Sequence, residues 1–228
     1  MSQVVLRQKG LVVADGILPA AGFGSLCKEV ACGDYRGVHA QKWDKAWRLW
    51  DGHPLRGESV YFDPNHAFGW KGATYPTSTS VDSLIDAVRG MSNACPDIAG
   101  AEGVDWIALY LSPWLYPVGS ALSLHRDAER YTGSFTYFAH SRWSVHWGGE
   151  LLVTPPTSES TVHSGDEPWM SEDGNDDADG TGIATCVSPR PNRLVVIAPD
   201  RPHRIARVDQ NAGAHLRASI AGFFLRSP

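Results

Sequence analysis

The sequence lacks the features that would assign it to several broad classes of protein. No apolar run approaches the roughly 20 residues that a membrane-spanning helix needs, and the N-terminal residues lack the layout of a signal peptide. The 20 Lys and Arg residues are not clustered, and 25 Asp and Glu residues give a net charge of −5. We therefore expect neither a membrane nor nucleic acid as a partner.

Cysteine is also sparse. The four cysteines are scattered and form no Cys-x-x-Cys pair of the kind that indicates a zinc or redox site. This usage predicts free thiols and a reducing, cytoplasmic location. The sequence gives no indication of the oligomeric state.

The pattern of the chain changes near residue 105. The 228 residues, 43% of them hydrophobic, suffice for one substantial core, and we expect a single domain over 1–228. Residues 1–104 are expected to form a helix-rich flanking region, with helices that begin near Pro19 and Ser80. Beyond it, short β-prone runs predict an α+β, mainly β protein with helices packed on a sandwich or barrel. The expected strands are 107–114, 121–124, 134–138, 150–153, 193–197, 204–208 and 216–225.

Residues 155–182 interrupt this succession of strands. They carry eight of the 25 acidic residues and few apolar ones, which is typical of a solvated insertion, and a lid over the site is the alternative. The spacing of Asn175, Asp177 and Asp179 resembles the start of an EF-hand loop. The twelfth position falls on Cys186 rather than Glu, so we reject a calcium site.

His125 and Asp127 are the first candidates for chemistry. In an extended strand, residues two apart project from the same face, so both side chains would enter one cavity. They would supply two of the three ligands, one histidine and the carboxylate, of the triad of two histidines and one carboxylate that holds non-haem Fe(II). For the third ligand we favour His203, which follows a β-prone run and a turn. His140 and His146 are rival ligands.

Arg217 and Ser219 share one face of the apolar, β-prone stretch 216–224. A buried guanidinium needs a partner, because an unpaired charge in a core costs several kcal/mol. The planar guanidinium matches a carboxylate bidentately, and the hydroxyl of Ser219 adds a third contact. The partner is either an internal Asp or Glu or a dicarboxylic ligand.

Four motifs follow one another between Trp106 and Phe224: Tyr116-Pro-Val-Gly119 nine residues before His125, Trp147-Gly-Gly-Glu-Leu151, Pro191-Asn-Arg-Leu194, and Arg217-x-Ser219 fourteen residues after His203. In this order they resemble the Fe(II)/2-oxoglutarate-dependent dioxygenases, specifically the branch of the prolyl 4-hydroxylase catalytic domains. Asn192 stands where that branch commonly has glycine, and asparagine also tolerates a left-handed backbone. The acidic insertion departs from the family pattern.

The resemblance implies a double-stranded β-helix, a jelly-roll or cupin-like core over 105–228, with flanking N-terminal helices. It implies Fe(II), 2-oxoglutarate and O2 as cofactor and co-substrates. The residues that match the family's motifs are His125, Asp127 and His203 for the metal, and Arg217 and Ser219 for the far carboxylate of 2-oxoglutarate. Tyr116 either contacts the co-substrate or substrate, or is an ordinary core tyrosine.

The resemblance also implies a reaction, in which 2-oxoglutarate is converted to succinate and CO2 while an unactivated C–H bond of the substrate is oxidised. Because Asp127 is present, no ligand position is vacated for a halide, so hydroxylation is expected over halogenation. Desaturation, cyclisation and epimerisation would use the same machinery.

The substrate contacts are expected from the aromatic and histidine residues after Asp127, namely Tyr131, Tyr137, His140 and Trp143. Arg142 is a candidate anchor for an anionic substrate. No separate peptide-binding module is evident, and the acidic insertion would attract an amine. We therefore favour a small-molecule substrate, such as an amino acid or a natural-product intermediate.

Three alternatives stay open. The first is a protein prolyl hydroxylase of the same fold, and the second is a non-catalytic binding module. The third is a cupin-type enzyme that uses oxygen without 2-oxoglutarate, in which Arg217 would have an internal acidic partner. The presence of both histidines, Asp127 and Arg217 in one chain counts against the binding module.

Overall fold

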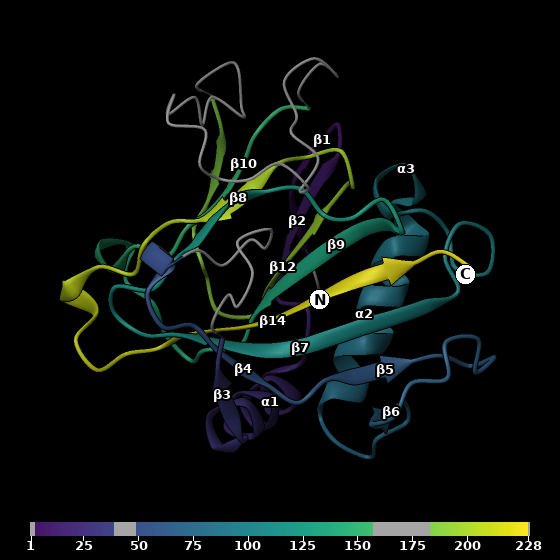
Figure 1. Cartoon of the computed structure of the whole chain (residues 1–228), viewed down its shortest axis with the longest axis horizontal. Coiled ribbons are helices and arrows are strands. Elements are labelled where there is room, and N and C mark those ends of the chain that lie inside the picture. Colours follow the sequence, from purple (N-terminus) through teal and green to yellow (C-terminus); the bar gives the residue numbers. More distant parts are fainter. Residues whose placement is uncertain (1–2, 39–48, 157–182, 228) are drawn as a thin grey trace.

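The computed structural model describes residues 3–38, 49–156 and 183–227. All but the first two residues of the acidic insertion 155–182 lie outside these ranges. The expectation that this insertion is either a solvated loop or a lid therefore concerns residues outside the described part of the chain. The described chain forms two β-sheets that face each other (Figure 1). None of its helices is long and apolar enough to cross a membrane. All four cysteines are free, as expected from their spacing.

The larger sheet contains ten strands. Its main path runs in the order β1 (Gln3–Gln8), β2 (Leu11–Asp15), β12 (Arg193–Ile197), β9 (Tyr131–Phe138), β14 (Arg217–Leu225), β7 (Ala108–Tyr116), β4 (Leu55–Gly57) and β3 (Tyr35–Gly37), and β5 (Val60–Phe62) pairs with both β7 and β6 (Ala73–Thr74). The smaller sheet has the order β11 (Thr185–Val187), β10 (Leu151–Val153), β13 (His203–Ile205) and β8 (Leu122–His125).

From β7 onward the chain passes repeatedly between the two sheets. The strands β7, β9, β12 and β14 belong to the larger sheet, and β8, β10, β11 and β13 belong to the smaller one. All pairings among these eight strands are antiparallel. This alternation is the arrangement of a double-stranded β-helix, which confirms the expected fold class.

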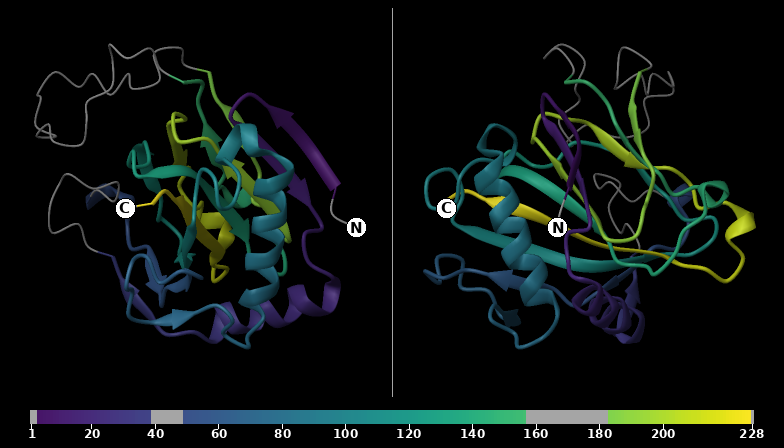
Figure 2. Two further views of the ribbon diagram at one scale, coloured as in Figure 1. Left: turned by 90° about the vertical axis from the view of Figure 1, so that its right-hand side faces the viewer. Right: turned by 180° about the vertical axis from the view of Figure 1, so that it is seen from behind.

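The helices cover the outer face of the larger sheet (Figure 2). Their bounds are α1 (Ala20–Cys32), α2 (Val81–Ala94) and the short α3 (Pro96–Ala99), and the 3-10 turns are η1 (Leu49–Asp51), η2 (Val145–Trp147) and η4 (Gln210–Ala212). The residues Leu84, Ile85 and Val88 recur at helical spacing and are buried in the same cluster as Leu26 of α1. Pro96 follows the end of α2 and opens α3.

The region before residue 105 is less helical than the sequence pattern predicts. It adds a strand pair, β1 and β2, to one edge of the larger sheet through β12, and short strands to the other edge through β7. The run Leu11–Ala14 is buried throughout, so this strand is a continuous apolar segment rather than an alternating one. The strands β3, β6 and β11 have only two or three residues, too few for a periodic pattern.

Side chains of the larger sheet alternate between its two faces. On β7, Leu109 and Leu111 pack with the helices, whereas Trp114 and Tyr116 pack toward the smaller sheet. The space between the sheets therefore receives every second side chain of β7, β9 and β14. The candidate site lies in this space.

Candidate metal centre and adjoining cavity

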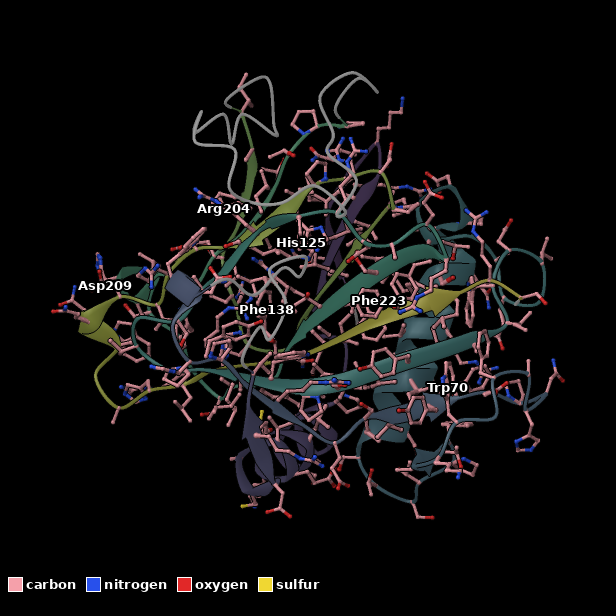
Figure 3. The ribbon with its side chains drawn as sticks, in the orientation of Figure 1. Trp70, His125, Phe138, Arg204, Asp209 and Phe223 are labelled. Atoms are coloured by element: carbon pink, nitrogen blue, oxygen red, sulfur yellow. The ribbon has the colours of Figure 1, made fainter. Side chains whose placement is uncertain are left out.

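The smaller sheet brings His125 and His203 together. The two residues are direct partners in the antiparallel pairing of β8 with β13, and their ring centroids are 4.4 Å apart. Figure 3 labels His125 on the smaller sheet. In a half-buried antiparallel pair, the register alone determines that both imidazoles project from the same face.

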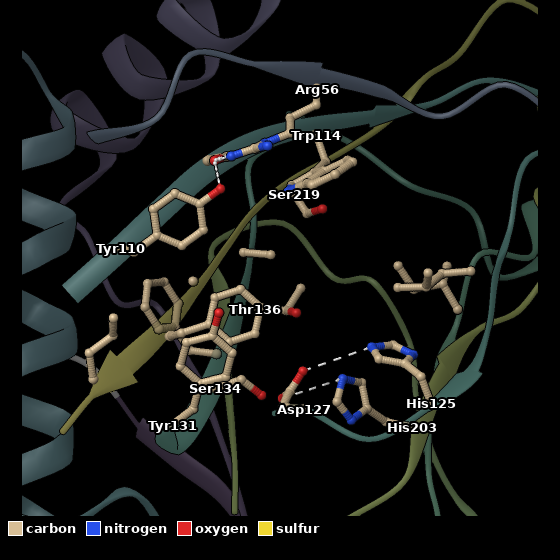
Figure 4. Close-up of a pocket in the computed structure, with 18 of the residues that line it drawn as sticks. Arg56, Tyr110, Trp114, His125, Asp127, Tyr131, Ser134, Thr136, His203 and Ser219 are labelled. Carbon is tan, nitrogen blue, oxygen red and sulfur yellow. Dashed lines mark hydrogen bonds and ion pairs between the residues drawn. The ribbon is translucent and has the colours of Figure 1, made fainter. Parts of the chain in front are cut away.

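Asp127 completes the cluster from the loop that follows β8. Its two carboxylate oxygens lie 3.9 Å from Nε2 of His125 and 3.9 Å from Nε2 of His203 (Figure 4). One potential ligand atom from each of the three residues lies within 4.8 Å of the others. The sequence pattern placed Asp127 on the same strand as His125, but the strand ends at His125. The side chain still enters the same cavity.

The hydrogen bonds of the two histidines select one tautomer. Nδ1 of His125 lies 2.9 Å from the carbonyl oxygen of Ser123, and Nδ1 of His203 lies 3.0 Å from that of Arg201. A neutral imidazole that donates from Nδ1 presents the lone pair of Nε2 as a ligand. Both Nε2 atoms face Asp127.

The electrostatics of the cluster favour a bound cation. Burial, followed by the proximity of His203, lowers the pKa of His125 to about 4, so its ring is neutral near pH 7. The Oδ2 atom of Asp127 is buried and has no hydrogen-bond partner. Two imidazole nitrogens and one carboxylate oxygen without a hydrogen-bond partner form a donor set that fits Fe(II). The residues present therefore suit the metal that the resemblance implies.

Asp51 supports this cluster from the 3-10 turn η1, a role that no sequence motif indicated. Its side chain is 2% exposed and accepts hydrogen bonds from Ser123, from the hydroxyl at 2.7 Å and from the backbone N–H at 3.1 Å. The carbonyl oxygen of Ser123 in turn holds the ring of His125. Asp51 is therefore a positioning residue for one of the candidate ligands.

Arg217 is fully buried at the start of β14, between the rings of Tyr116 and Phe138. Its Nε donates to the carbonyl oxygen of Gly149 at 2.7 Å, and its Nη1 donates to Oγ of Ser219 at 3.1 Å. Nη2 is buried and has no partner. Burial lowers the pKa of Arg217 to about 10.

No described carboxylate forms an ion pair with Arg217, although Tyr116 and then Glu150 raise its pKa against the effect of burial. The internal acidic partner expected for a cupin-type enzyme is therefore absent from the described residues. A guanidinium in this state still has the capacity to bind one carboxylate.

The two glycines of the Gly-Gly-Glu motif allow the backbone to pass close to Arg217. Gly148 and Gly149 both have positive φ, at 66° and 73°. A Cβ on Gly149 would lie 2.8 Å from Cδ of Arg217, and one on Gly148 would clash with the carbonyl oxygen of Arg207. These contacts leave no room for a side chain at either position.

A cavity of about 510 Å³ extends from the metal cluster between the sheets. His125, Asp127 and His203 line it, and so do Tyr116 and Ser219. Arg217 does not line it, but its Nη1 donates to the hydroxyl of Ser219, which does.

Of the four residues expected to contact the substrate, one lines the cavity and three do not. Tyr131 lines the cavity, whereas Tyr137, His140 and Trp143 do not. Tyr137 is a correction to the sequence-based expectation: it lies on the outer face of β9, where its hydroxyl donates to Oδ1 of Asn192 at 2.7 Å. The period of two predicted which residues share a face, but not which face is the inner one.

The other candidates are engaged elsewhere. The ring nitrogens of His140 lie 3.0 and 2.7 Å from the carbonyl oxygens of Ala218 and Pro189, and the indole N–H of Trp143 donates to the carbonyl oxygen of Gly148. The rival ligand His146 is exposed and lies outside the metal cluster. Arg142 contacts His215 and the ring of Trp147 rather than the cavity.

Solved structures of known proteins share this architecture. A prolyl-4-hydroxylase from Pseudomonas putida matches with a TM-score of 0.62 over 96% of this chain and 94% of that chain, at 17% sequence identity. A Trichoplax adhaerens prolyl hydroxylase, solved with a peptide fragment of the hypoxia inducible factor, matches with a TM-score of 0.63 over 96% and 84%, at 12% identity. An oxidoreductase of the 2OG-Fe(II) oxygenase family from Burkholderia pseudomallei matches with a TM-score of 0.57 over 97% and 87%, at 14% identity.

The fold is that of the 2-oxoglutarate/Fe(II) oxygenases. The likeness is one of structure only, because no family model and no curated protein matches the sequence. The expected resemblance thus holds for the fold of the whole described chain, including the region before Trp106, where no motif supported it.

Proposed function

We propose that the protein is an Fe(II)- and 2-oxoglutarate-dependent oxygenase that hydroxylates an unactivated C–H bond of a small molecule. The overall reaction consumes the substrate, O2 and 2-oxoglutarate and yields the hydroxylated product, succinate and CO2. The observation that carries the proposal is the unsatisfied Oδ2 of Asp127 beside two Nε2 atoms, on the oxygenase fold.

In this proposal His125, Asp127 and His203 hold Fe(II), which would activate oxygen when 2-oxoglutarate is bound to it. The Nδ1 hydrogen bonds fix the two imidazoles in the ligand tautomer before the metal arrives. Arg217 and Ser219 bind the far carboxylate of 2-oxoglutarate, and the burial of Arg217 strengthens this charge-assisted contact by excluding water. Tyr116 packs against the guanidinium and lines the cavity beside it.

A small-molecule substrate is supported by the size of the cavity. Its volume of about 510 Å³ is within the range of roughly 300–1,000 Å³ that is common for small-molecule sites. The competing hypothesis is a protein prolyl hydroxylase, which is favoured by a structural neighbour that was solved with a peptide. Turnover of free small molecules without turnover of proline-containing peptides would distinguish the two.

Anaerobic titration is the experiment that tests the proposal. Addition of Fe(II) and then 2-oxoglutarate is expected to produce the visible charge-transfer band of the chelate at one equivalent of each. Exposure to air should then release succinate. A protein that binds Fe(II) but produces neither the band nor succinate would contradict the proposal and favour a cupin-type enzyme.

A further inference from the structure

A second arginine, Arg56, reaches the cavity from the wall opposite the metal cluster. It lies on β4, where it pairs with Trp114 of β7, and both residues line the cavity. Figure 4 shows Arg56, Tyr110 and Trp114 on one side and His125, Asp127 and His203 on the other. A ligand in the cavity therefore has the metal cluster at one end and a guanidinium at the other.

The hydrogen-bond partners of Arg56 are neutral. Its Nη2 donates to Oγ of Ser59 at 2.8 Å and to Oγ of Ser112 at 3.2 Å, and its Nε lies 3.3 Å from the same oxygen of Ser112. Within residues 3–38, 49–156 and 183–227, no carboxylate forms an ion pair with it. Burial lowers the pKa of Arg56, which is the effect expected for a partly desolvated cation without a counter-ion.

Two aromatic rings hold the guanidinium in place. Its central carbon lies 5.4 Å from the ring centroid of Tyr110 and 5.7 Å from that of Trp114. Cation–π contacts of this length orient an arginine without neutralising its charge. The positive charge stays available to a ligand.

The cavity wall beyond Arg56 is aromatic. Trp70 stacks on Phe68 at 4.5 Å and on Tyr61 at 4.6 Å, and Phe223 stacks on Tyr131 at 4.3 Å. All five residues line the cavity, and Figure 3 labels Trp70 and Phe223. Stacked rings of this kind present flat apolar surfaces that suit a planar ligand body.

The charges that line the cavity are mostly positive. The described lining contains two arginines, Arg56 and Arg130, and a single carboxylate, that of Asp127. Asp127 is a candidate metal ligand, so its charge is directed to the cation. The cavity therefore favours an anion over the amine that the acidic insertion led us to expect.

We infer that Arg56 binds the carboxylate of the substrate, and that the substrate is a carboxylic acid with a flat apolar body. This inference rests on the proposed function and specifies its substrate class. Arg217 already provides an unsatisfied donor beside Ser219 for the co-substrate, so the two arginines serve two different acids. Anchoring at Arg56 holds the apolar body between the aromatic wall and the metal cluster, where a C–H bond is presented for oxidation.

Calorimetric binding to the protein loaded with redox-inert Zn(II) and 2-oxoglutarate tests the inference. The probes are phenylacetate, 3-phenylpropanoate and indole-3-acetate, each compared with its primary amide. The acids should bind the unaltered protein more tightly than the amides do. The substitution Arg56→Gln should weaken binding of the acids by about tenfold or more and leave the amides unchanged, because it removes one charge-assisted contact.

Arg36→Gln is the matched control. Arg36 pairs with Arg56 across β3 and β4 but is exposed and does not line the cavity. Its loss removes the same charge nearby and should change acid binding by less than about twofold, a small effect at the surface. Arg56→Lys, which keeps the charge but not the planar donor pair, should give an intermediate affinity. An equal loss in the Arg36 and Arg56 variants would overturn the inference.

The remaining outcomes separate the inference from the proposed function. If no acid binds the unaltered protein more tightly than its amide, the inference is wrong. If Arg56→Gln weakens 2-oxoglutarate as much as it weakens the acids, Arg56 binds the co-substrate and the inference is again wrong. If the unaltered Zn(II) protein does not bind 2-oxoglutarate at all, the proposed function is wrong. The difference in affinity between each acid and its amide still tests whether Arg56 binds a carboxylate.

Discussion

The two faces of the larger sheet differ in how they satisfy their buried polar groups. On the outer face, the hydroxyl of Tyr137 donates to Asn192, and the amide of Asn192 donates to the carbonyl oxygen of Leu18. On the inner face, Oγ of Ser134 and Nη2 of Arg217 are buried without partners. The same strand, β9, carries both Tyr137 and Ser134.

This difference separates structural polar groups from candidate functional ones. A buried polar atom without a partner costs about 1–3 kcal/mol, and folded proteins contain few of them. The outer face avoids this cost because its groups bond to each other. The inner face retains this cost at Ser134, which lines the cavity, and at Arg217, which bonds to the cavity-lining Ser219, so that a ligand can supply a missing partner there.

Removal of a candidate metal ligand should have the largest effect. Asp127→Ala deletes the one carboxylate among the three clustered side chains, so metal affinity should fall by more than about 100-fold and turnover should be lost. Asp51→Asn, which weakens only the support of Ser123, should lower metal affinity by about tenfold. Zn(II) competition against a chromophoric chelator measures both. Equal metal affinity in Asp127→Ala and the unaltered protein would exclude Asp127 as a ligand.

Arg217→Met should separate ligand binding from stability. The affinity for 2-oxoglutarate should fall by about 100-fold, because a buried charge-assisted contact is lost, while the metal stays bound. The melting temperature without ligand should not fall, because an uncompensated buried cation is replaced by an apolar chain. Thermal unfolding with Zn(II), with and without 2-oxoglutarate, measures both effects. Loss of the metal from this variant would contradict the assigned role.

A pair of substitutions on β9 tests the two faces directly. Tyr137→Phe removes a satisfied hydrogen bond and should destabilise the protein by about 1 kcal/mol without changing the affinity for 2-oxoglutarate. Ser134→Ala removes an unsatisfied hydroxyl and should leave the stability unchanged or raise it. Urea unfolding of the protein without ligands measures both. A larger loss of stability in Ser134→Ala than in Tyr137→Phe would contradict the difference between the two faces.

The smallest expected effect is on alkaline stability, and it comes from the outer layer. Burial raises the pKa of Cys27 from 9.0 to about 11 and that of Tyr35 from 10.0 to about 12. Between the unfolded and folded pKa values the unfolded chain releases protons that the folded chain keeps, so stability should fall as pH rises from about 9 to 11. In urea unfolding over this range, Cys27→Ala should show a shallower decline than the unaltered protein.

The sequence could predict what depends on the period of two. That period correctly paired Arg217 with Ser219 on one face, and motif spacing selected His203 over His140. The period of two could not predict that Arg56 lines the cavity. The strand β4 has only three residues, and the position of the Arg56 side chain depends on the pairing of β4 with the distant strand β7. Asp51 was missed for the same reason, since it acts through a tertiary contact with Ser123.

The pairing of His125 with His203 also has a consequence for the smaller sheet itself. A slip of β13 by one residue against β8 would turn the imidazole of His203 away from the cavity. An ion coordinated by both rings would act as a cross-link that only the correct strand alignment permits. The metal would thus fasten together two short strands from distant regions of the chain, and its removal would loosen the smaller sheet before the larger one.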